Sequence, residues 1–184
     1  MLKKYIFSVF DLKKSHPFDE VELNYIKKML REYSLKREGI WLQILPYTKF
    51  EFLWCDKMNG ENGVMGAFSV LFKNKIFLQQ YDYNGMPKDS DGSGRISWLE
   101  QMFPTIIHEL RHAYQWKTNK LLYVICCLPI LRQFTIEKDA NAKQKECMPF
   151  IERWIKFEDY KYADRHNLLG EDKIEIPPKE ESKK

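Results

Sequence analysis

The residues with the clearest chemical potential are His108, Glu109 and His112, which form a His-Glu-x-x-His motif inside an apolar, helix-favouring segment, residues 105–115. Residues four apart lie on one face of a helix, so the two imidazoles are expected to point at one ion. Glu109 follows about 100° around the helix axis. It would lie beside the ion, where a general base for a metal-activated water belongs. The alternative is a surface helix whose two histidines are four residues apart by chance.

A candidate third ligand, Glu137, begins the segment Glu137-Lys138-Asp139-Ala140-Asn141. Catalytic zinc takes three protein ligands and keeps an open position, and two histidines with one glutamate are a standard set. If the segment is helical, Ala140 would let two helices approach closely, and Asn141 would hydrogen-bond a ligand histidine. The alternative role of Glu137 is that of a first-turn acid that stabilises a helix N-terminus.

The run His-Glu-Leu-Arg-His-Ala-Tyr-Gln at 108–115, followed by Glu-x-x-Ala-Asn at 137–141, resembles the gluzincin-type metallopeptidases. It is most similar to the compact SprT-like and ImmA/IrrE-like zincin domains, over roughly residues 40–150. The chain departs from those relatives after Asn141, where it has Ala-Lys-Gln-Lys rather than Phe-Ala, and it has no zinc-ribbon cysteine pairs downstream. The subfamily and the substrate therefore stay open.

The resemblance implies an α+β, zincin-like single domain: a small, mostly antiparallel sheet packed on the active-site helix, with a second ligand-bearing helix. It also implies that His108, His112 and Glu137 bind Zn²⁺ and that Glu109 acts as base and acid in the hydrolysis of a protein or peptide substrate. The competing function is a regulatory or DNA-associated binding module that keeps the fold without useful peptidase activity. Salt-dependent DNA binding would favour that alternative.

A second group of oxygen-bearing side chains lies in residues 89–100, which match most of an EF-hand calcium loop. The expected ligands of a structural Ca²⁺ are Asp89, Asp91, Ser93 and Glu100. The preceding residues do not favour a helix, however, and no second loop pairs with this one. The alternative is an ordinary Gly/Asp loop in which Ser97 and Glu100 form a capping box for the next helix.

The chain of 184 residues is long enough for one domain with a sizeable core, and its 44% hydrophobic and 30% charged residues are typical of globular proteins. The net charge of +4 permits a nucleic-acid partner but does not indicate one, because acids and bases are interspersed. The four cysteines have no zinc-knuckle or redox spacing, so reduced thiols and a cytoplasmic location are expected. We expect one domain over residues 1–176 and a charged, disordered tail over 177–184.

Two apolar segments bear on targeting. Residues 5–10 are followed by an acid, which makes the run too short for a signal peptide, and the eleven residues 121–131 are too few to span a bilayer. We expect 121–131 to be a buried connection between the two ligand-bearing helices; contact with a membrane surface is the alternative. Oligomeric state is left open by the sequence.

Hydrophobic periodicity predicts the elements that must position these residues. A helix is expected from Asp19 to Gly39, strands over 41–45 and 49–54, a hairpin of residues 67–72 and 76–79, and a second ligand-bearing helix over 135–154 with a break at Pro149. Pro104 either begins the active-site helix or kinks a longer one. The hairpin is the candidate edge for binding extended substrate by strand addition.

Overall fold

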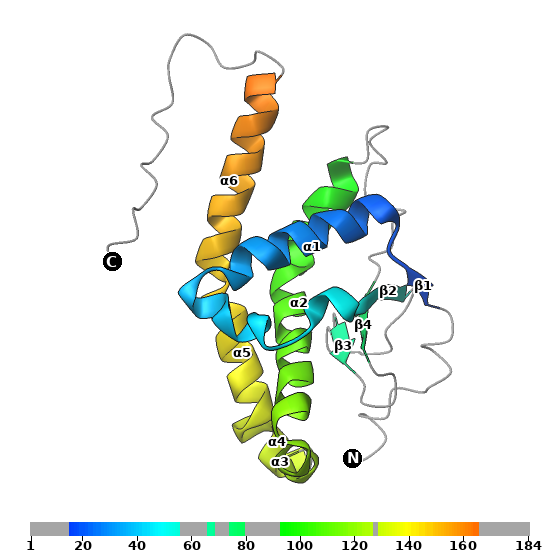
Figure 1. The fold of residues 1–184 in the computed structure, drawn as a ribbon, viewed down its shortest axis with the longest axis vertical. Coiled ribbons are helices and arrows are strands. Elements are labelled where there is room, and N and C mark those ends of the chain that lie inside the picture. Colours follow the sequence, from blue (N-terminus) through cyan, green and yellow to red (C-terminus); the bar gives the residue numbers. More distant parts are fainter. Residues whose placement is uncertain (1–14, 56–65, 69–73, 80–92, 127–128, 166–184) are drawn as a thin grey trace. The chain divides into compact units, whose positions relative to one another are not determined.

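The computed structural model describes residues 15–55, 66–68, 74–79, 93–126 and 129–165 (Figure 1). The chain divides into two compact units, Met1–Ile151 and Glu152–Lys184, and all the described candidate site residues belong to the first. The described part of the second unit continues a helix in which Lys161 pairs with Glu158 and lies over the ring of Phe157. The predicted tail, 177–184, lies outside the described residues.

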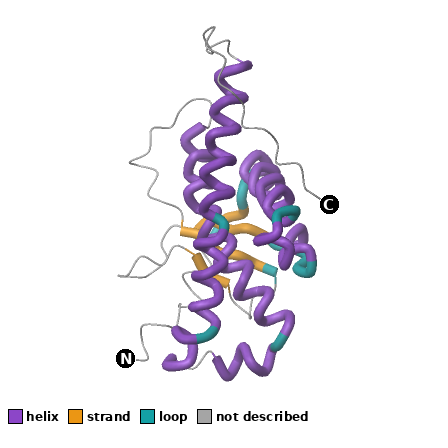
Figure 2. Tube along the Cα trace, turned by 90° about the vertical axis from the view of Figure 1, so that its left-hand side faces the viewer, coloured by secondary structure: helices purple, strands orange, loops and turns teal. Residues whose placement is uncertain are grey.

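Four short strands form one mixed sheet in the order β1-β2-β4-β3 (orange in Figure 2). They are β1 (His16–Pro17), β2 (Glu51–Cys55), β3 (Gly66–Phe68) and β4 (Lys75–Gln79). β2 pairs antiparallel with β1 and parallel with β4, and β3 pairs antiparallel with β4. The expected α+β class is therefore confirmed, and β3 and β4 pair as the predicted hairpin requires.

The first helix, α1 (Glu20–Ser34), begins where the sequence predicts, at Asp19. The Asp19 side chain accepts a hydrogen bond from the Glu22 amide (2.8 Å), and the Glu22 side chain accepts one from the Asp19 amide (2.9 Å). This capping box satisfies donors that the first helical turn leaves unpaired. Glu22 also accepts a hydrogen bond from the Trp54 indole (3.1 Å), which fastens the start of α1 to the centre of the sheet.

The central helix, α2 (Ser93–Thr118), contains Pro104 in its interior, so the longer of the two predicted helices is the one present. It contacts α1, β3, β4 and α5 (Ile136–Glu146), and it places an apolar side in the core of the first unit. The fully buried side chains on that side are Leu99, Met102, Phe103, Ile106, Ile107 and Leu110. Burial of so many large side chains fixes the helix firmly against the sheet.

The predicted strand over residues 41–45 is wrong, because this segment belongs to the 3₁₀ helix η3 (Arg37–Gln43) and the turn after it. Trp41, Leu42 and Leu45 are buried, while Gln43 and Ile44 are exposed. That spacing of three to four residues follows helical periodicity rather than the alternation of a strand. A second 3₁₀ turn, η4 (Tyr47–Lys49), then leads into β2.

The expected burial of residues 121–131 is also wrong for the residues the structure describes. This segment forms two short helices, α3 (Lys120–Cys126) and α4 (Pro129–Phe134). The large apolar side chains of α3 are exposed, up to 74% for Leu121, and Tyr123 alone turns inward to half-burial. A two-turn helix packed along one side leaves its other sides open. Within the described residues, no helix is long and apolar enough to cross a membrane.

The break predicted near Pro149 is present, because α5 ends at Glu146 and α6 (Met148–Arg165) begins two residues later. Cys147, which caps α5, has a buried thiol. Burial raises the pKa of this thiol to about 12, which favours the protonated, unreactive form.

Replacing Gly39 by alanine is expected to destabilise the first unit. A Cβ atom at this position would lie 2.1 Å from the Tyr33 carbonyl oxygen, so α1 and η3 could not keep their present separation. We expect the free energy of unfolding to fall by about 1–3 kcal/mol, the usual range for overpacking. Urea denaturation measures this, with Glu38→Ala as the control on an exposed neighbour. Equal stability of the two variants would contradict the close approach.

Candidate metal centre

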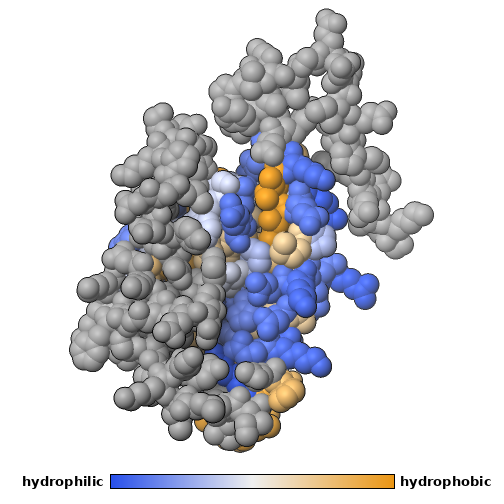
Figure 3. All heavy atoms as spheres, turned by 180° about the vertical axis from the view of Figure 1, so that it is seen from behind, coloured by the Kyte–Doolittle hydropathy of each residue, from blue (hydrophilic) through white to orange (hydrophobic). Residues whose placement is uncertain are grey.

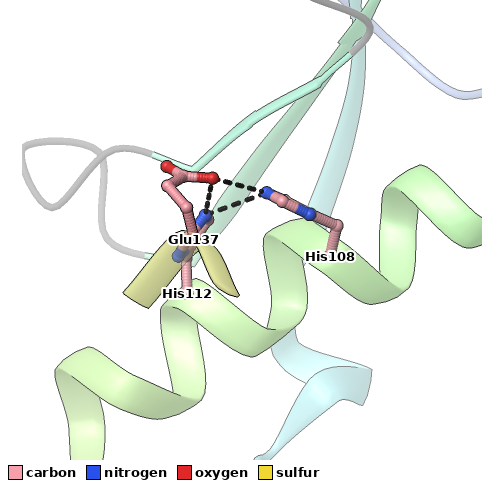
Figure 4. Close-up of side chains that lie close together, drawn as sticks. All are labelled: His108, His112 and Glu137. Carbon is pink, nitrogen blue, oxygen red and sulfur yellow. Dashed lines mark hydrogen bonds and ion pairs between the residues drawn. The ribbon is translucent and has the colours of Figure 1, made fainter. Parts of the chain in front are cut away.

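His108 and His112 lie one turn apart on α2 and direct their Nε2 atoms toward Glu137, in the first turn of α5 (Figure 4). The two Nε2 atoms are 3.0 Å apart. Oε2 of Glu137 lies 3.2 Å from Nε2 of His108 and 3.5 Å from Nε2 of His112. The structure therefore brings together the three residues that the sequence singles out as ligands.

The spacing of these atoms fits one small metal ion. Zinc bonds of about 2.0–2.2 Å in a tetrahedron place neighbouring ligand atoms roughly 3.3–3.6 Å apart, close to the separations here. Two imidazole nitrogens and a carboxylate oxygen also form one of the usual donor sets of catalytic zinc. These three residues could hold a metal ion. Binding would require both Nε2 atoms to be free of protons, because the metal uses their lone pairs.

Arg132 holds the other oxygen of the Glu137 carboxylate. Its Nε atom donates to Oε1 at 2.6 Å. Burial alone would raise the pKa of Glu137, but hydrogen bonds to His108 and His112 and the charges of His112 and Arg132 lower it below the usual carboxyl range. Glu137 is therefore a fixed carboxylate at the working pH, which is the form that binds a cation.

Glu109 lies on the side of α2 that faces the sheet and is 7% exposed. Its Oε2 atom accepts a hydrogen bond from the Phe68 amide of β3 at 2.8 Å. Burial raises the pKa of Glu109, and the opposing effects of the His112 and His108 charges do not cancel that rise. The backbone of β3 lies very close to α2 here, since a Cβ atom on Gly66 would lie 3.0 Å from Cγ of Glu109.

A polar bridge beside the ligands joins α2 to α5. Oε1 of Gln115 lies 3.0 Å from Nδ1 of His112. Nε2 of Gln115 donates to the Ile136 carbonyl (3.0 Å) and to the Asp139 carboxylate (2.7 Å). Arg111 donates to the same Asp139 carboxylate through Nε (2.6 Å) and Nη2 (3.1 Å). Gln115 thus orients one ligand imidazole while it fixes the first turn of the helix that contains Glu137.

The predicted role of Asn141 as the hydrogen-bond partner of a ligand histidine is filled by Gln115. Asn141 is exposed on α5, whereas the amide of Gln115 faces Nδ1 of His112. Nδ1 of His108 is buried and has no hydrogen-bond partner among the described residues. Among the described residues, a polar side chain therefore holds the Nδ1 atom of His112 but not that of His108.

Arg111 is held on its other side by aromatic rings. Its guanidinium carbon lies 4.6 Å from the centre of the Tyr114 ring and 5.2 Å from that of Trp41. A guanidinium group between aromatic faces and a carboxylate is attracted from both directions. This arrangement limits the conformations open to Arg111 and so to its partner Asp139.

Of the four residues predicted to bind calcium, only Glu100 has a described side chain, so the calcium site stays a prediction. Asp89 and Asp91 lie outside the described residues, and Ser93 is the first residue of α2. Glu100 is buried within α2 and accepts a hydrogen bond from the Tyr25 hydroxyl of α1. Its carboxylate serves the packing of α1 on α2, which gives the calcium prediction no support.

Sequence reasoning missed Gln115, Asp139 and Arg132, although two of them had a usable signal. Gln115 is three residues after His112 and so lies on the same helix face. Asp139 and Arg111 have opposite charges, and they lie beside the predicted ligands on the two segments that a shared metal ion would bring together. The contact of Arg132 with Glu137 depends on how α4 packs on α5, for which the sequence has no local signal.

Comparisons with protein-family models, with curated proteins and with solved structures found no match to this chain.

Replacing Gln115 by alanine is expected to weaken metal binding about 10–100-fold, the usual effect of removing a group that orients a ligand. The variant loses the polar contact to His112 and both contacts to α5. Competition with a chromophoric chelator measures the affinity. Asn141→Ala is the matched control and should bind metal as the wild type does. A larger loss in Asn141→Ala than in Gln115→Ala would contradict this assignment.

Proposed function

We propose that this protein is a zinc-dependent metallopeptidase of zincin type. The observation that supports this most directly is the convergence of His108 Nε2, His112 Nε2 and Glu137 Oε2 within 3.5 Å of one another, next to the buried carboxyl group of Glu109. A zinc ion bound by such a set lowers the pKa of water and polarises a carbonyl group, which is the chemistry that peptide hydrolysis needs.

Each residue then has a distinct role. His108, His112 and Glu137 would hold the ion, and Gln115 would keep the His112 ring in place. Arg132 would keep Glu137 ionised and positioned through its second oxygen. The two carboxyl groups differ in the direction of their pKa shifts, which suits one as a permanent ligand and the other as a group that exchanges protons.

Glu109 is our candidate for the group that accepts a proton from water and delivers it to the leaving amine. A carboxyl group with a raised pKa holds a proton more readily near neutral pH, as an acid–base catalyst must. The Phe68 amide fixes one carboxyl oxygen, so the side chain does not have to be ordered when the substrate binds.

The sheet offers a place for an extended peptide. β3 is at the end of the strand order and contacts α2, the helix that contains Glu109. An edge strand has unpaired backbone groups that another extended chain can pair with. We propose that the substrate peptide pairs with the edge of β3 beside the Phe68 amide, which already donates to Glu109, so that the peptide backbone would lie close to Glu109.

The variant Glu109→Gln tests the proposed reaction. Glutamine keeps an oxygen that can accept from the Phe68 amide but cannot accept the proton, so zinc content should be retained while hydrolysis falls about 10²–10⁴-fold. The measurement is cleavage of an unfolded protein and of a peptide library, read by mass spectrometry. Unchanged hydrolysis in Glu109→Gln would contradict the assigned role. Zinc binding without any hydrolysis by the wild type would favour the binding-module alternative.

A further inference from the structure

The short helices α3 and α4 expose an unusual amount of apolar surface. Among the described residues, twelve large hydrophobic side chains are exposed, and six of these fall within residues 121–134. They are Leu121, Leu122, Val124 and Ile125 on α3, and Leu131 and Phe134 on α4. We call this group the α3–α4 patch. Figure 3 shows apolar atoms at the lower end of the face it draws, beside atoms drawn in grey, at the end where Figure 1 places these two helices. A group of exposed apolar side chains on two neighbouring short helices indicates a surface that binds a partner.

The charged residues of the segment that forms the α3–α4 patch all have one sign. Residues 117–136 contain three basic residues and no acidic residue, in a chain whose 184 residues include 26 acids. Arg132 is paired with the Glu137 carboxylate. Lys117 and Lys120, in contrast, are exposed at the start of the patch and have no acidic partner among the ion pairs of the described residues. The ammonium group of Lys117 donates to the neutral Ile44 carbonyl (2.7 Å), so its charge is not neutralised. A protein partner of opposite charge, or an anionic lipid surface, would complement it.

The aromatic residues at the same border favour the lipid surface. Trp116 and Tyr123 are half-buried and meet edge to face at 5.7 Å, and Lys120 lies over the Trp116 ring at 5.9 Å. Tryptophan, tyrosine and lysine beside an exposed aliphatic group are the composition of an interfacial anchor. α3 is a seven-residue helix, which suits contact with a membrane surface and not passage across it.

We propose that the α3–α4 patch binds the surface of a membrane that contains anionic lipid, with the apolar side chains in the acyl boundary and Lys117 and Lys120 at the headgroups. A second copy of this chain is a poorer occupant, because its α3–α4 patch has charge of the same sign and offers no acidic group to Lys117 and Lys120. The membrane contact does not depend on peptidase activity. If the proposed function also holds, the metal centre would act near the membrane, because the Tyr123 ring lies 6.4 Å from that of His112.

Co-sedimentation with vesicles tests this inference. The wild-type protein should bind vesicles of phosphatidylcholine with a minority of phosphatidylglycerol, bind pure phosphatidylcholine more weakly, and lose part of its binding at high salt. Leu121→Glu and Leu122→Glu should each lower the partition coefficient about tenfold or more, since each removes one large apolar side chain. Lys120→Glu should lower binding to the anionic vesicles alone.

The matched control is Val21→Glu, which puts the same charge on an exposed apolar position of α1 (68% exposed) and should leave binding unchanged. The thermal unfolding midpoint of each variant, followed by circular dichroism, reports whether the first unit remains folded whether or not metal is bound. Absence of binding by the wild type would overturn the proposal, as would an equal loss in Val21→Glu. A concentration-dependent dimer that Leu121→Glu abolishes, without vesicle binding, would assign the patch to a second copy. Weaker peptide cleavage by Leu121→Glu, again without vesicle binding, would assign it to the substrate.

Discussion

The packing of α2 against α5 is the constraint on which the candidate centre depends. His108 and His112 are aligned by the geometry of their own helix, whereas Glu137 comes from a separate helix and meets them only if that helix is held in place. The bidentate ion pair of Arg111 with Asp139 lies next to the ligands in both helices. A charge-assisted, two-point contact of this kind restricts both distance and orientation, which a purely apolar contact does not.

The two carboxyl groups beside the histidines lie in different electrostatic surroundings. The first unit places two carboxyl groups near two imidazoles, and the surroundings shift the pKa values of those carboxyl groups in opposite directions. Glu137 is partly exposed, hydrogen-bonds His108 and His112 and pairs with Arg132, and these interactions keep its pKa low enough for it to stay ionised. Glu109 is buried against β3, where its charged form is less favourable. A site that binds a cation and also moves protons needs this separation of roles.

Local signals in the sequence predicted the parts of this molecule that local physics decides. The i, i+4 spacing predicted the two histidines on one helix face, and hydrophobic periodicity predicted a helix that begins at Asp19, where the structure has a capping box. The prediction failed at 41–45 and 121–131, where apolar composition alone does not distinguish a strand from a 3₁₀ helix or a buried helix from an exposed one. Gln115 had a local signal in its spacing from His112, whereas the contact of Arg132 with Glu137 depends on how α4 packs on α5, which no local pattern contains.

The most direct test of the proposed centre is the metal content of protein purified without added metal. Wild type is compared with Glu137→Ala and with Glu146→Ala, which removes an exposed acid from the same helix. The account predicts about one zinc per chain in wild type and in Glu146→Ala, and loss of zinc in Glu137→Ala. A wild-type protein that takes up no zinc even after reconstitution would contradict the central claim, and so would a Glu137→Ala variant that retains it.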